Sequence, residues 1–140
     1  MTKQIVADCS VCGAWYVRDE RSNAAEKLLD RVLREEVSLI VPDLWWHENL
    51  NLLRTCVMRE RMSLQEARKA FYFLEEIPLE TVHAQRIGHA RIFELAVQHQ
   101  LSAYDATYLS LAEARGLTLV TADQHLLTLR LQHDWIEQLR

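Results

Sequence analysis

Short runs rich in β-branched residues alternate along this chain with longer segments whose apolar residues recur every three or four positions. The short runs lie at residues 5–7, 39–41 and 117–120. A run of this kind predicts a buried strand, and apolar spacing of three or four predicts a helix. Because strands that alternate with helices form βαβ units, the pattern predicts an α/β fold with a parallel sheet and helices on both of its faces.

Capping signals set the expected limits of the helices. Ser22 or Asn23 is placed to cap the second helix, Asp43 the third, and Ser102 a helix that ends before Gly116, while Ser63 begins a capping-box pattern with Glu66. The expected helices lie over residues 9–17, 25–33, 44–59, 63–74, 82–99 and 103–115, with a short last one that holds Leu126. Two more short strands are expected, an edge strand at 77–79 and a last strand at 135–136.

The composition indicates one globular domain. The chain has 140 residues, of which 49% are hydrophobic and 26% charged, so it can bury a core without disulfides. Only 3 Gly and 2 Pro are present, which favours long helices over an all-β design. We therefore expect residues 1–140 to form a single domain.

The charge balance bears on the class of partner. Acidic residues (20) outnumber Lys and Arg (16), and the formal net charge is −4. This argues against a protein held to nucleic acid by bulk positive charge, although an enzyme can still meet a polyanion through a metal ion. The 3 Cys are an odd number, and we see neither a signal peptide nor a membrane span, so we expect free thiols and a cytoplasmic protein.

Four acids fall where predicted strands end or predicted helices begin. They are Asp8, Glu48, Asp105 and Asp123. The carboxyl ends of parallel strands share one edge of a sheet, so these side chains are expected to approach one another there. Each of Asp8, Asp105 and Asp123 is also placed to be only a helix N-cap, and for any one of them that interpretation is about as good.

Carboxylates gathered in one cleft repel one another unless a cation neutralises them. Their hard oxygen atoms bind Mg²⁺ or Mn²⁺, and such an ion activates water and offsets the charge that grows on a phosphate during hydrolysis. The four acids together therefore predict a divalent-metal site for phosphodiester cleavage, assembled by the fold from residues far apart in the chain.

The segments around these acids resemble the PIN domain family, and within it the toxin ribonucleases of VapC type. The matching stretches occur in the family's order and span nearly the whole chain, at residues 6–10, 42–51, 101–112 and 119–126. The resemblance implies a three-layer α/β/α sandwich with a central, mainly parallel sheet and a helical arm. It also implies metal-dependent cleavage of RNA, inhibition by a cognate antitoxin protein, and a homodimer.

The resemblance also implies roles for individual residues. The family's catalytic and metal-binding acids correspond to Asp8, Glu48, Asp105 and Asp123. Polar side chains that would orient those acids or the attacking water correspond to Ser10, Asn51 and Thr121. Segment 60–76 corresponds to the helical arm on which an antitoxin docks.

Other interpretations stay open at this point. A PIN-like module that binds RNA or a protein without cutting it needs the fold but no metal. Cys9 and Cys12 have the C-x-x-C spacing of a redox pair, although small side chains packed against the sheet explain them more simply. Trp45 and Trp46 either stack a base near the cleft or pack in the core or at a dimer contact.

Overall fold

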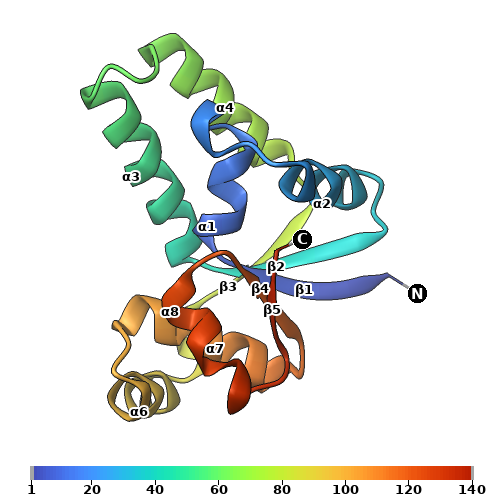
Figure 1. The fold of residues 1–140 in the computed structure, drawn as a ribbon, viewed down its shortest axis with the longest axis vertical. Helices are drawn as coiled ribbons and strands as arrows, with labels where there is room; N and C mark the ends of the chain where they lie inside the picture. The colour runs from blue at the N-terminus through green and yellow to red at the C-terminus, as the bar shows by residue number, and fades with distance from the viewer. Residues whose placement is uncertain (1, 140) are drawn as a thin grey trace.

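The computed structural model describes residues 2–139, and within them the sheet has five strands, all parallel (Figure 1). In spatial order these are β3 (Leu79–Val82), β2 (Val37–Pro42), β1 (Lys3–Ala7), β4 (Thr118–Thr121) and β5 (Ile136–Gln138). The three strands predicted from β-branched runs are confirmed as β1, β2 and β4. The strand order reverses between β1 and β4, which is where an open α/β sheet binds its ligand.

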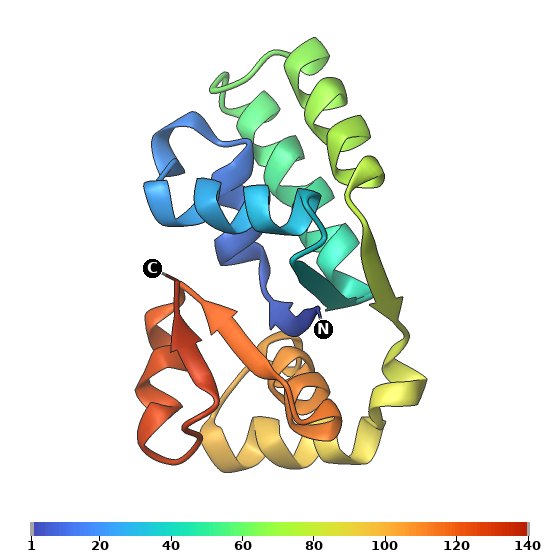
Figure 2. The same ribbon diagram turned by 90° about the vertical axis from the view of Figure 1, so that its right-hand side faces the viewer.

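Helices cover both faces of this sheet (Figures 1 and 2). One side carries α1 (Cys9–Cys12), α2 (Asn23–Leu33), α3 (Leu44–Met58) and α4 (Leu64–Glu76), with the 3₁₀ turns η1 (Gly13–Trp15) and η2 (Arg18–Glu20). The other side carries α5 (Ala84–Ile87), α6 (His89–His99), α7 (Ala103–Arg115), α8 (Gln124–Leu127) and the 3₁₀ turn η3 (Thr128–Leu131). The predicted sandwich is confirmed, and α3 and α4 form the helical arm.

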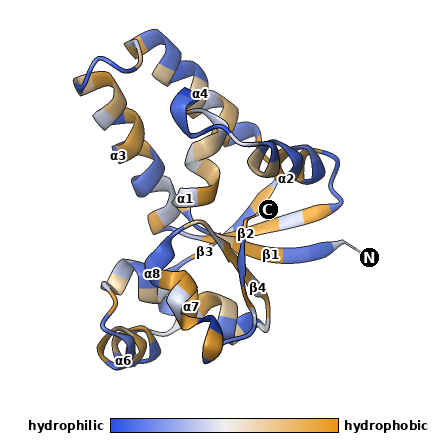
Figure 3. Ribbon diagram, viewed as in Figure 1, coloured by the Kyte–Doolittle hydropathy of each residue, from blue (hydrophilic) through white to orange (hydrophobic). Residues whose placement is uncertain are grey.

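The core lies along the central strands and α7. Val6, Leu39 and Ile40 are fully buried, as expected for parallel strands covered on both faces. Residues 106–112 of α7 are all buried, so this helix is packed on every side. Figure 3 shows hydrophobic colour along β2 and mixed colours along the arm. Within residues 2–139, the helices lack the combination of length and hydrophobicity needed to cross a bilayer.

Three of the predicted helix caps are confirmed by side-chain hydrogen bonds. The hydroxyls of Ser22, Ser63 and Ser102 each accept a bond from the backbone N–H three residues later, at 3.0–3.1 Å. Gly116 follows α7 with a φ of 63°, the left-handed conformation that commonly ends a helix and that glycine adopts easily.

The predicted helix over 82–99 is wrong in its limits. Val82 closes β3, and Gly88 separates α5 from α6 with a φ of 106°. Glycine reaches this conformation at little steric cost, so the chain turns where an apolar repeat alone predicts continuity.

The predicted helix over 9–17 is also too long, because α1 gives way to η1 at Gly13. A Cβ at Gly13 would stand 2.7 Å from Leu52 Cδ2 on α3. Glycine therefore lets this segment pass close against α3, which brings the end of β1 next to the arm.

Two smaller expectations are also corrected. Asp43 does not cap α3, because it is itself helical (φ −49°, ψ −40°) and its carboxylate meets His83 Nδ1 instead. The edge strand lies at 79–82 and not at 77–79, since Pro78 has no N–H to donate. The last strand is confirmed as β5, although it begins at Ile136.

Candidate active site

Asp8 follows β1 directly, and its carboxylate is almost fully enclosed. The backbone N–H and the hydroxyl of Ser10 both donate to Oδ1, the first at 3.1 Å. Thr121 Oγ1 donates to Oδ2 at 2.5 Å. Burial raises the pKa of Asp8, and these hydrogen bonds oppose the rise. Asp8 thus caps α1 through the backbone N–H of Ser10. The two hydroxyl groups that donate to its carboxylate oxygens are additional hydrogen bonds that a cap does not need.

Ser10 and Thr121 join the ends of β1 and β4 around this carboxylate. Ser10 Oγ accepts from the backbone N–H of Ala122 at 3.0 Å, and Thr121 Oγ1 accepts from that of Asp123 at 3.0 Å. The two hydroxyl oxygens are 3.3 Å apart. Because each hydroxyl accepts from the backbone, its own proton is directed to Asp8, so both side chains orient the acid.

Glu48 extends from the second turn of α3 and is half-buried. The hydroxyl of Tyr108 donates to its Oε1 at 2.5 Å across 60 residues of sequence. Burial raises the pKa of Glu48, the Tyr108 hydrogen bond opposes the rise, and the negative charges of Asp8 and Asp105 add to it.

Asp105 and Asp123 approach from α7 and α8. Asp105 lies in the first turn of α7, whose N-cap is Ser102, so the N-cap interpretation is wrong for Asp105. Burial raises the pKa of Asp105, and the charge of Asp123 raises it further. Asp123 does cap α8, since its Oδ1 accepts from the backbone N–H of His125 at 2.8 Å.

Electrostatic repulsion links the four acids in a ring. Burial is the largest cause of each raised pKa, and Asp123 adds to those of Asp8 and Asp105. Asp8 and Asp105 in turn add to the pKa of Glu48. In the part of the chain that the structure describes, neither Lys nor Arg forms an ion pair with any of them. The ring is therefore a concentration of negative charge, which His125 offsets in part at Asp105.

The chemistry of these donors fits a hard divalent cation, because all are carboxylates and together carry excess negative charge. Among residues 2–139, however, no three His, Cys, Asp or Glu side chains stand close enough together to hold a metal ion. The four acids thus lie within electrostatic reach of one another, but three of them do not surround one point. Mg²⁺ is usually held by one or two carboxylates, with water at its other positions, so this arrangement still fits such an ion.

Asn51 lies farther from the acids than Ser10 and Thr121, which both contact Asp8. Its side chain is exposed on α3 and lines, with Glu48, Ser10 and Cys9, an open hollow of about 800 Å³. Asn51 and Glu48 are three residues apart and share one face of α3, but no contact of Asn51 with an acid is seen among the described residues.

Two groups behind the acids were not predicted from the sequence. Tyr108 is 1% exposed and is the hydrogen-bond donor to Glu48. Asn49 is buried, and its Oδ1 accepts from the Tyr16 hydroxyl at 2.6 Å. A spacing of three residues from Asp105 was the available signal for Tyr108, because it places both on one face of α7.

The cysteines are free thiols, as predicted, and their pKa values argue against the redox interpretation. Burial raises the pKa of Cys9 to about 12, and the charges of Glu48 and Asp8 add to this. Burial also raises the pKa of Cys12, whose sulfur accepts from Trp45 Nε1 at 3.2 Å. Because the thiolate is the reactive form, both residues are packing residues here.

The tryptophans pack inside the molecule. Trp45 is fully buried, and Trp46 donates its Nε1–H to Thr81 Oγ1 at 3.0 Å. The two rings meet edge to face with centroids 4.8 Å apart. The core interpretation is confirmed for Trp45, and Trp46 is held against β3 by its own hydrogen bond.

Known proteins share the sequence pattern and the fold of this chain. The model of the PIN domain matches residues 5–130, a span that includes all four acids. The chain belongs to the PIN domain family. A relative of this PIN domain, Ribonuclease VapC3 of Pyrobaculum aerophilum, is 32% identical over 128 residues, which are 88% of this chain and 92% of the relative.

Solved structures share the fold of this PIN domain. A crystal structure from Pyrobaculum aerophilum has a TM-score of 0.73 at 22% identity, and the match covers 99% of this chain and 84% of the chain in that structure. A toxin–antitoxin complex from Klebsiella pneumoniae has a TM-score of 0.60 at 15% identity, and the match covers 94% of each chain. At these identities, the likeness concerns the fold.

Proposed function

We propose that this PIN domain is an endoribonuclease that hydrolyses RNA phosphodiester bonds with Mg²⁺ or Mn²⁺, as the toxin of a toxin–antitoxin pair. The observation that carries the proposal is the ring of mutually repelling carboxylates at the carboxyl ends of β1 and β4. A purely structural role does not explain it, because carboxyls with raised pKa values make the folded state less stable at neutral pH. A relative named as a ribonuclease over most of the chain supports RNA as substrate.

Each residue has a role in this proposal. The ligands of the metal would be Asp8, Glu48, Asp105 and Asp123. A bound Mg²⁺ or Mn²⁺ would neutralise phosphate charge and lower the pKa of the attacking water. Ser10 and Thr121 hold Asp8 in place by hydrogen bonds on both carboxylate oxygens, and Tyr108 does the same for Glu48. Asn51 faces the hollow beside Glu48, where it would contact the RNA or a water molecule.

An antitoxin is proposed to dock on the arm. Between α3 and α4 lies a groove of about 390 Å³ that exposes Leu50, Met58, Leu64 and Tyr72. Arg54 and Arg68 also line it, so it suits an amphipathic helix with acidic flanks. The Klebsiella pneumoniae neighbour is described as a toxin–antitoxin complex, which supports a partner of this kind. The test is binding by a small DNA-binding protein encoded immediately upstream, which Leu64→Asp should abolish.

A homodimer is proposed through α6. Phe93 and Val97 are four residues apart, lie on one face of this helix, and are 69% and 63% exposed. Two copies that pack these faces together would remove this apolar surface from water. Sedimentation should show a dimer for the unaltered chain and a monomer for Phe93→Asp.

The test of the function compares RNA cleavage by the purified protein and three variants in the presence of Mg²⁺ or Mn²⁺. Asp8→Asn and Asp105→Asn should each lower cleavage by about a hundredfold or more, because loss of an outer partner of a ligand alone costs about 10–100-fold. Asp30→Asn, an exposed acid on α2, is the matched control and should cleave like the unaltered chain. Unchanged cleavage in both site variants would remove the assignment.

The alternative, an RNA- or protein-binding module that does not cut, makes a different prediction. It requires that RNA or a protein partner is bound without hydrolysis and that divalent cations at millimolar concentration do not bind. A metal titration of the unaltered chain and of Asp8→Asn separates the two functions.

A further inference from the structure

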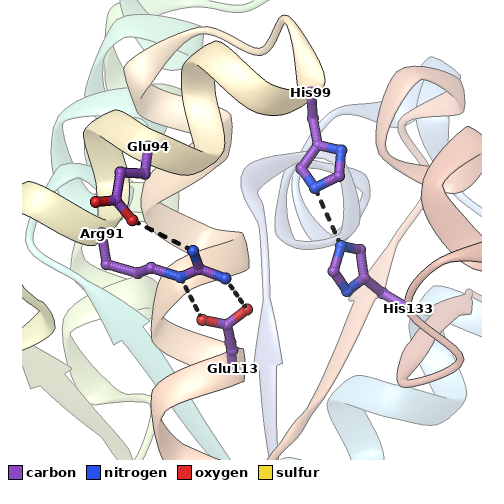
Figure 4. Close-up of polar contacts among 5 residues, drawn as sticks. All are labelled: Arg91, Glu94, His99, Glu113 and His133. Atoms are coloured by element: carbon purple, nitrogen blue, oxygen red, sulfur yellow. Dashed lines mark hydrogen bonds and ion pairs between the residues drawn. The ribbon is translucent and has the colours of Figure 1, made fainter.

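Two histidines face one another on the part of the molecule that carries α6 and the turn before β5. His99 is the last residue of α6, and His133 lies between η3 and β5. Their Nε2 atoms are 3.2 Å apart, and the ring planes are nearly perpendicular, at 80° (Figure 4). We call His99 and His133 the histidine pair.

The two atoms are at hydrogen-bonding distance, and their spacing also matches that of two ligands in a metal chelate. Zinc–imidazole bonds are about 2.0–2.1 Å long, and two such bonds at the tetrahedral angle put the nitrogens about 3.3–3.4 Å apart. The observed 3.2 Å differs from this by little more than a tenth of an ångström. Imidazole nitrogen is a preferred ligand of Zn²⁺ and Ni²⁺, whereas Mg²⁺ and Mn²⁺ prefer the carboxylates at the other site.

Both imidazoles are held in place by packing. The His133 ring lies between His99 and Trp135, with ring centroids 5.1 Å from each. Its backbone N–H donates to Leu129 O at 2.9 Å, and its carbonyl accepts from the Ile136 N–H at 3.2 Å. A ligand pair whose backbone and ring positions are already fixed binds a metal without a large ordering cost.

The charges beside the histidine pair partly cancel. Arg91 is held by Glu113 through two hydrogen bonds of 2.7 and 2.9 Å and also meets Glu94 (Figure 4), so Glu113, which favours a cation at His133, is offset by Arg91, which disfavours one. Burial lowers the pKa of His133, and the neighbouring His99 lowers it further, so its imidazole is neutral and able to bind a metal at neutral pH. Glu113 is engaged with Arg91, which leaves the remaining metal positions to water.

The position of the histidine pair separates it from the acids. His133 precedes β5, and all strands of the sheet are parallel, so it lies toward the end of the sheet opposite to the carboxyl ends that carry Asp8 and Asp123. We propose that His99 and His133 bind one Zn²⁺ ion, which links the end of α6 to the segment that enters β5. The site stabilises the C-terminal edge of the sheet and is independent of the proposed nuclease chemistry.

The experiment is a calorimetric titration of the full chain with Zn²⁺ in millimolar Mg²⁺, on an Asp105→Asn background that weakens the carboxylate site. One Zn²⁺ per chain should bind, and His99→Gln and His133→Gln should each weaken binding by more than about tenfold, since even an outer partner of a ligand is worth about 10–100-fold. His47→Gln, an exposed histidine on α3, is the matched control and should bind normally. Equal Zn²⁺ binding in both pair variants, or none in the background protein, overturns the proposal.

A second measurement needs no change to the histidine pair. In the unaltered chain with millimolar Mg²⁺, Zn²⁺ should shift the imidazole NMR signals of His99 and His133 and raise Tm by several degrees, because a ligand that binds only the folded state stabilises it. The His47 signal should not move. Shifts confined to other histidines would contradict the proposed site.

Discussion

Replacing Tyr108 with Phe tests how Glu48 is held, because it removes one hydroxyl from a fully packed position. Tyr108 is 1% exposed, and its hydroxyl meets Glu48 Oε1 at 2.5 Å. A hydrogen bond to a charged group contributes about 1.5–3 kcal/mol, and a bond between neutral groups about 0.5–1.5 kcal/mol. Because Glu48 is half-exposed and water can replace part of the loss, we expect Tyr108→Phe to lower the free energy of unfolding by about 1–2 kcal/mol when Glu48 is ionised.

The sign of the pH dependence follows from Glu48. Burial raises its folded-state pKa above the ordinary 4.5, so its ionisation makes the folded state less stable as pH rises through that range. The Tyr108 hydrogen bond opposes this, and Tyr108→Phe raises the pKa further. The stability difference between the two proteins should therefore be smaller at about pH 5 than at about pH 8.

The assay is urea unfolding followed by tryptophan fluorescence, in EDTA so that metals do not contribute. Tyr104→Phe is the matched control, because Tyr104 lies on the same helix and is 66% exposed. It should match the unaltered chain at both pH values. The reasoning would be refuted if Tyr108→Phe lowered the free energy of unfolding equally at the two pH values, or more at the lower one.

Three further substitutions have expected outcomes. Asp105→Asn should lower RNA cleavage by about a hundredfold or more yet raise Tm in EDTA at neutral pH, because it removes a half-buried carboxylate with a raised pKa; a lower Tm would count against the repulsion described for the site. Thr121→Val keeps the shape but removes the donor to Asp8 Oδ2, so we expect a loss of about 1–3 kcal/mol in urea unfolding, and an unchanged unfolding curve would show that the bond contributes nothing. Gly13→Ala should change the free energy of unfolding by less than about 1 kcal/mol, because the helical φ of −58° suits alanine and Leu52 Cδ2, the end of a flexible side chain, can shift; a loss of several kcal/mol would show that Leu52 cannot move.

The strands and the approach of the acids were predictable because they depend on local pattern and one topological rule. Residues 39–41 are an uninterrupted apolar run of which two are β-branched, which is typical of a strand buried on both faces. Asp8 and Asp123 each follow such a run, and parallel strands end at the same edge. These inferences need only the order of elements along the chain.

The features that were missed depend on a backbone conformation that the spacing does not encode or on contacts between distant segments. A lone glycine is tolerated within a helix, so the spacing around Gly88 does not reveal that the chain turns there with a φ of 106°. Asp43 has a capping residue type, yet a histidine 40 positions later engages its carboxylate. The hydroxyl of Tyr108 finds its partner 60 residues away, and apolar periodicity marks such a tyrosine only as core.

The central claim is that the carboxylate ring acts through a divalent cation, and metal removal tests it most directly. RNA cleavage by the unaltered chain should stop in EDTA and return when Mg²⁺ or Mn²⁺ is added in excess, while Asp105→Asn stays inactive throughout. Cleavage that continues undiminished in EDTA would contradict the claim.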